Sequence, residues 1–75
     1  MKINFPKNWS LVEVSECAYM NIQYYKHYNL DEKVDPNEPN SFYEVALAAI
    51  EKLLRSHDAY YQKRAEQYRV QLFNV

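Results

Sequence analysis

One long apolar stripe near the C-terminus constrains the fold of this chain more than any other feature. Between residues 41 and 73, mostly apolar side chains recur every three or four positions, which is the spacing of one helix face. The main row is Tyr43, Leu47, Ile50, Leu54, His57, Tyr61, Ala65, Tyr68 and Leu72, and a second row beside it is Phe42, Val45, Ala49, Leu53 and Tyr60. No Gly or Pro interrupts the segment. The stripe predicts a long helix over residues 42–73.

The start of this helix is marked by a capping motif, and its middle contains residues that could end it. Ser41 and Glu44 are spaced as a capping box, in which each side chain accepts a hydrogen bond from the other residue's backbone amide. At residues 55–58, Ser56 or Asp58 has the chemistry to cap a separate helix. We favour a continuous helix because the stripe crosses this tetrapeptide in phase. A break near 56–58 is the alternative.

A second helix is predicted over residues 11–28. Ser10 and Glu13 form another capping box, and Trp9 precedes it, where an apolar side chain can pack onto the first turn. The predicted core row is Leu11, Val14, Ala18, Ile22, Tyr25 and Tyr28. Asn29 is suited to end this helix in place of Gly.

The remaining segments predict how the helices are arranged. Residues 1–9 read as an extended arm that lies across a helix, and residues 31–40 form an acidic linker with two prolines that can reverse the chain. We therefore predict a single small all-α domain over residues 1–75, an antiparallel helical hairpin. The longer helix would extend past its partner, so that part of its stripe would need cover from outside.

Composition agrees with a small helical protein that has a thin core. The chain has 75 residues, no Gly, eight Tyr and a net charge of −1. A core of this size stabilises a fold by only about 3–5 kcal/mol, so a homodimer or a bound partner would help. The single cysteine favours a reducing compartment, the first residues do not resemble a signal peptide, and no apolar run approaches ~20 residues. We expect a cytoplasmic protein without a membrane association.

The chain shows no motif for catalysis, metal binding or cofactor binding. His27 and His57 have no companion ligands at metal-site spacing, and phosphate-binding loops need the glycines that are absent here. Cys17 lies within the first predicted helix beside apolar neighbours, which is typical of an inert buried thiol. We expect no enzymatic activity, no cofactor and no metal.

The tyrosines are the most unusual feature and carry the functional prediction. Tyrosine combines a large apolar ring with a hydroxyl and is enriched at protein interfaces. We expect a small non-enzymatic interaction protein, a modulator, inhibitor or immunity-like factor, that binds another protein or a second copy of itself. The predicted contact residues are Tyr24, Tyr28, Tyr60, Tyr61, Tyr68, Leu72 and Phe73.

The alternative function is regulation through nucleic acid. Basic side chains alternate with tyrosines in the C-terminal segment, and such side chains can contact phosphates and stack on bases. The candidate contacts are Lys52, Arg55, Lys63, Arg64 and Arg69. The chain lacks the strong positive charge of a dedicated nucleic-acid binder, so this remains the second hypothesis.

Overall fold

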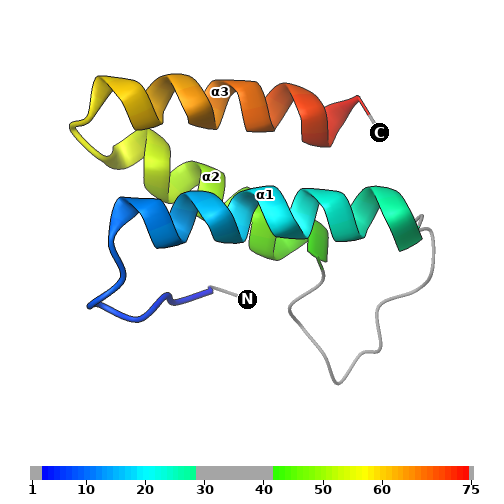
Figure 1. Ribbon diagram of the computed structural model, residues 1–75, viewed down its shortest axis with the longest axis horizontal. Helices are drawn as coiled ribbons and strands as arrows, with labels where there is room; N and C mark the ends of the chain where they lie inside the picture. Colours follow the sequence, from blue (N-terminus) through cyan, green and yellow to red (C-terminus); the bar gives the residue numbers. More distant parts are fainter. Residues whose placement is uncertain (1–2, 29–41, 75) are drawn as a thin grey trace.

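Three α-helices share one core in the computed structural model, which describes residues 3–28 and 42–74 (Figure 1). The helices are α1 (Leu11–Tyr28), α2 (Phe42–Arg55) and α3 (Ala59–Phe73). α2 runs opposite to α1, and α3 runs in the same direction as α1 (Figure 1). The predicted all-α fold, with its first two helices antiparallel, is confirmed. The part of the chain that the structure describes contains no strand.

The predicted capping box at the start of α1 is confirmed. The backbone amide of Ser10 donates to Glu13 Oε1 at 3.2 Å, and the backbone amide of Glu13 donates to Ser10 Oγ at 3.4 Å. These two bonds satisfy amides that the first helical turn leaves without partners. The predicted cap at Ser41, the helix end at Asn29 and the linker at 31–40 lie outside the described residues.

The predicted continuous helix over 42–73 is wrong, and the alternative break is confirmed. α2 ends at Arg55, where the amide and hydroxyl of Ser56 both donate to the Leu53 carbonyl, at 3.1 and 2.6 Å. Asp58 has an extended backbone, and its carboxylate accepts from the amides of Tyr60 and Tyr61 at 2.9 and 3.3 Å. A carboxylate that caps the next helix competes with continuation of the previous one.

The break lets α3 fold back and complete the core. Side chains of all three helices are buried together: Val14, Ala18, Ile22, Ala46, Ala49, Ile50, Leu53, Ala65, Tyr68 and Leu72. The expectation that the second half of the apolar stripe needs cover from outside is therefore wrong. Ala65, Tyr68 and Leu72 obtain that cover from the chain itself.

The inward face of α2 lies between the two predicted rows. Its buried side chains are Ala46, Ala49, Ile50 and Leu53, whereas Tyr43, Leu47 and Leu54 pack against the core only in part. His57, which the stripe placed on the apolar face, lies exposed in the break, and Tyr60 is 62% exposed. The change of direction at residues 56–58 explains both differences, because positions after it no longer continue the face of α2.

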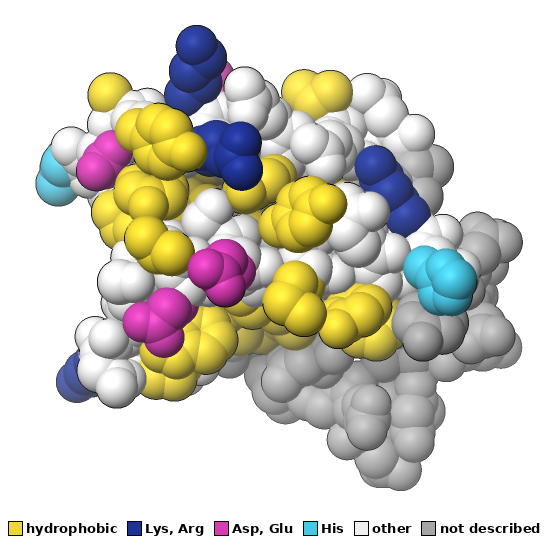
Figure 2. Space-filling model, viewed as in Figure 1, with side chains coloured by type: hydrophobic (Ala, Val, Ile, Leu, Met, Phe, Trp, Pro, Cys, Tyr) yellow, Lys and Arg dark blue, Asp and Glu magenta, His cyan; other side chains and the backbone are white. Residues whose placement is uncertain are grey.

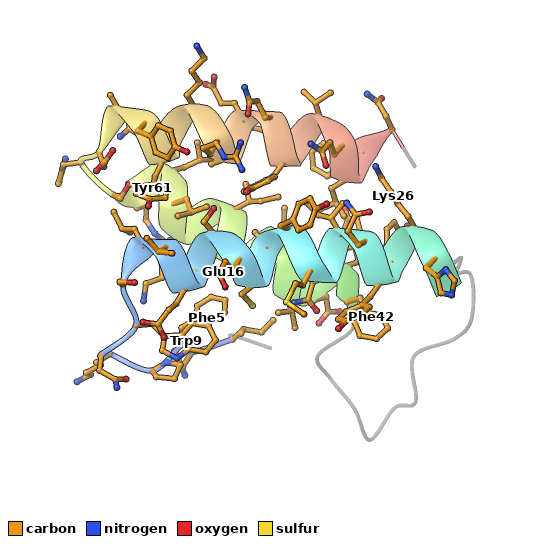
Figure 3. All side chains as sticks on the ribbon, viewed as in Figure 1. Phe5, Trp9, Glu16, Lys26, Phe42 and Tyr61 are labelled. Carbon is orange, nitrogen blue, oxygen red and sulfur yellow. The ribbon has the colours of Figure 1, made fainter. Side chains whose placement is uncertain are left out.

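The N-terminal arm lies against the helices, as predicted. Phe5 and Trp9 stack with ring centroids 5.6 Å apart, and both pack against the core (Figure 3). The amide of Trp9 donates to the Pro6 carbonyl at 3.1 Å, which closes a turn just before α1. The arm thereby lies beside α2, and Ile3 and Phe5 line a groove with Leu47 and Lys52.

Candidate functional site: a tyrosine-lined groove between α1 and α3

An open groove of about 450 Å³ lies between α1 and α3. We call it the tyrosine groove and define it by its lining residues, Val12, Ser15, Glu16, Tyr19, Met20, Tyr60, Tyr61, Arg64 and Tyr68. Figure 3 shows Glu16 on the first half of α1 and Tyr61 at the start of α3. In Figure 2, hydrophobic side chains gather over these parts of the two helices, with acidic and basic side chains among them.

Much of the groove wall is apolar surface that faces solvent. Val12 is 50% exposed, Tyr19 48%, Met20 47% and Tyr60 62%. These are four of the seven large hydrophobic side chains that are exposed in the described residues. Apolar side chains scattered singly on a surface are ordinary, but a contiguous group around a groove is typical of a binding site.

The floor of the groove is a polar network centred on the Tyr68 hydroxyl. Tyr68 is 3% exposed, and its hydroxyl lies 3.1 Å from that of Ser15, which is also buried. Arg64 donates to the same hydroxyl at 2.9 Å, and its guanidinium carbon lies 5.2 Å from the centre of the Tyr68 ring. The hydrogen bond with Tyr68 raises the pKa of Arg64 further above its ordinary value, at which the guanidinium is already charged.

The break before α3 positions the aromatic wall. Because the Asp58 carboxylate accepts from the amides of Tyr60 and Tyr61, it fixes the first turn of α3, from which both rings project. These rings meet edge to face with centroids 4.9 Å apart. The Tyr19 ring lies 6.3 Å from that of Tyr68 across the groove. The aromatic surface is therefore held by contacts within and between the helices.

The groove places hydroxyl, carboxylate and guanidinium groups beside apolar surface. A serine nucleophile needs a base as its hydrogen-bond partner, and the partner of Ser15 is the Tyr68 hydroxyl. Cys17 does not line the groove, and burial raises the pKa of its thiol. Within residues 3–28 and 42–74, no three His, Cys, Asp or Glu side chains gather to hold a metal ion. The groove can supply apolar area, hydrogen-bond donors and one guanidinium.

The structure brings together three of the predicted contact residues and separates the others. Tyr60, Tyr61 and Tyr68 line the groove, although Tyr68 forms its floor and presents little surface. Leu72 is 1% exposed, so a partner cannot reach it in the folded chain. Tyr24 packs on Phe42 and Phe73 on Tyr43, with ring centroids 5.2 and 6.4 Å apart, away from the groove. The side chain of Tyr28 lies outside the described residues.

The α1 wall was missed by the sequence analysis. Val12, Glu16, Tyr19 and Met20 follow one another at steps of four, three and one, so they share a second face of α1. That spacing was visible in the sequence. We did not single out this spacing because the core row of Val14, Ala18 and Ile22 by itself explains a helix with one buried face.

The five candidate nucleic-acid contacts do not share a surface. Lys52 and Arg55 line a separate groove of about 440 Å³ between the arm and α2, where Lys52 lies 5.6 Å from the centre of the Phe5 ring. Arg64 belongs to the tyrosine groove, and the Arg69 guanidinium lies 5.9 Å from the centre of the Phe73 ring. Lys63 is exposed on α3. Within residues 3–28 and 42–74, these side chains thus form no continuous basic stripe for a phosphate backbone.

Comparisons of the chain with protein-family models, curated proteins and solved structures find no match. None of the described helices is long and apolar enough to cross a membrane. The function of the protein is therefore inferred from the chemistry of its own residues.

Proposed function

We propose that this chain is a small non-enzymatic interaction module that binds another protein chain through the tyrosine groove. The observation that carries the proposal is the concentration of Val12, Tyr19, Met20 and Tyr60 around one groove while Tyr68 and Leu72 fill the core. Covering such a patch removes apolar surface from water, which stabilises a complex by about 25 cal/mol per Å² before the costs of association.

The mode of action follows from what the groove contains. With largely apolar walls, the Arg64 guanidinium and the Glu16 carboxylate, the module acts by occupying a surface, as a modulator, inhibitor or immunity-like factor does. The single Cys17 favours a reducing compartment, so the proposal includes a cytoplasmic location.

Site-directed photocrosslinking in the native host tests this proposal. Tyr60 is replaced by the photoreactive residue p-benzoylphenylalanine, and a matched variant carries the same residue at Gln67, which is exposed on α3 but does not line the groove. We expect a discrete covalent adduct from position 60 and none from position 67. Absence of any adduct, or the same adducts from both positions, would contradict the proposal. The mass of the adduct distinguishes a second copy from a foreign protein.

A further inference from the structure

We infer that a second copy of this chain docks on the tyrosine groove about a two-fold axis, with Glu16 of each copy against Arg64 of the other. The inference rests on the proposed function and names the occupant of the groove. It is carried by the two apolar sides of α1 and the charges on the two groove walls, and the size of the exposed patch sets the expected strength.

The helix α1 is apolar on two sides. Val14, Ala18 and Ile22 are fully buried against the other helices. About a third of a turn away, Val12, Tyr19 and Met20 are each close to half exposed. In a water-soluble protein, a helix with one apolar side can expose its polar side to water. A helix with two apolar sides needs both of them covered. Within the described residues, α2 and α3 cover only the first side.

The two groove walls carry opposite charges. Glu16 on α1 and Arg64 on α3 are the charged side chains among the lining residues. The described residues give the Glu16 carboxylate no hydrogen bond or ion pair, and they occupy one donor of Arg64, the N–H that bonds to Tyr68. Each group therefore keeps the capacity to form a charge-assisted bond with an incoming chain.

The two charges lie at about the same level along the groove. The Tyr68 hydroxyl lies 3.1 Å from that of Ser15, the neighbour of Glu16, and accepts a hydrogen bond from the Arg64 guanidinium at 2.9 Å. A two-fold axis that lies in the interface plane and runs parallel to the groove exchanges the walls and lays α1 of one copy over α3 of the other. Each Glu16 then meets the second copy's Arg64, and the apolar side chains of both copies face each other. A patch with opposite charges on its two walls is complementary to itself, as an isologous interface requires.

The exposed area sets the strength of such a dimer. Fully buried aromatic side chains cover 150–250 Å², so the exposed parts of Tyr19 and Tyr60, together with those of Val12 and Met20, offer about 400 Å² per copy. The pair would remove about 800 Å² of this surface from water, below the 1,200–2,000 Å² of stable complexes. Polar side chains at the rim add to this area. The structure therefore points to a weak, reversible dimer that forms as concentration rises.

Sedimentation equilibrium of the whole purified chain, over about two decades of concentration, tests the inference by mass action. We expect the average mass of the wild type to rise from monomer towards dimer. Glu16→Arg and Arg64→Glu should each raise the dimer Kd at least about tenfold, because like charges then face each other. Mixing the two variants should restore association as a heterodimer, since both cross-pairs become attractive. Glu66→Arg, a charge reversal on the exposed part of α3 outside the groove, should leave the Kd unchanged.

A folding measurement and one further variant ensure that the experiment can decide between the outcomes. Arg64→Glu removes the hydrogen bond to Tyr68, so circular dichroism must show that each variant remains helical. If Arg64→Glu does not fold, Met20→Lys replaces it, because the Met20 side chain is about half exposed in the groove and should also weaken the dimer at least about tenfold.

A wild type that stays monomeric throughout would overturn the inference, as would a mixture that associates no better than its components. When Met20→Lys stands in for Arg64→Glu, a Kd unchanged by both Met20→Lys and Glu16→Arg would overturn it. A monomer that nevertheless crosslinks a foreign protein from position 60 would leave the proposed function standing.

Discussion

The hydroxyl of Tyr68 on α3 lies 3.1 Å from the hydroxyl of Ser15 on α1, although 53 positions separate the two residues in the chain. Both side chains are buried, and Arg64 donates to the same tyrosine oxygen at 2.9 Å. This bond joins the first helix to the last and forms the floor of the tyrosine groove. A buried polar pair stabilises a fold only while both partners are present.

Tyr68→Phe should therefore lower the free energy of unfolding by about 1–2 kcal/mol, because the buried Ser15 hydroxyl loses its partner while the ring remains. Urea denaturation followed by circular dichroism measures the change. Tyr60→Phe is the matched control, since that ring is 62% exposed and its hydroxyl has no partner among the described residues. Equal effects of the two substitutions would show that the Ser15–Tyr68 bond contributes nothing.

Leu72→Ala should remove most of the stability of the fold. The side chain is 1% exposed, and truncating a buried leucine costs about 2–5 kcal/mol. Domains of this size have about 3–5 kcal/mol in total. Circular dichroism at 25 °C should show a large loss of helix, whereas Val70→Ala, at a position that is 58% exposed on the same helix, should change little. A stable Leu72→Ala variant would mean that α3 does not pack as described.

Asp58→Ala should destabilise the protein by about 1 kcal/mol, because the amides of Tyr60 and Tyr61 lose the carboxylate that accepts from them. Asp58→Asn keeps a side-chain oxygen at the same place and should recover most of the loss. Thermal unfolding of the three proteins side by side measures the effect. If Asn behaves like Ala, the side-chain oxygen is not the source of the stabilisation.

The Cys17 thiol should react slowly with iodoacetamide in the folded protein. Burial raises the pKa of this thiol, and because the thiolate is the reactive form, less of it is present at any given pH. The rate should rise only at a higher pH than in the urea-unfolded chain. Asn21 donates to the sulfur at 3.4 Å and lowers the pKa, so Asn21→Ala should move the profile further upward. Identical pH profiles for the folded and unfolded chains would contradict this expectation.

The amino-acid sequence was sufficient to predict the local features of the fold. Ser10 and Glu13 marked the start of α1 because a capping box depends only on residues three positions apart. The buried row of Val14, Ala18 and Ile22 followed from the helical repeat. The same reasoning recognised Asp58 as a possible cap but ranked it second, because the apolar stripe stays in phase across the break.

The phase of a stripe does not report the direction of the helix axis. Tyr61, Ala65, Tyr68 and Leu72 recur at helical spacing whether α3 continues α2 or folds back beside it. The fold-back depends on contacts such as Ser15–Tyr68, which join residues far apart in the chain. The tyrosine groove forms only when α3 folds back, because its two walls come from the first and the last helix. The sequence by itself therefore determined which segments are helical and where α1 begins, but not that the helix breaks at residues 56–58. Only the tertiary structure decided which tyrosines stay exposed, since burial depends on the packing of distant segments.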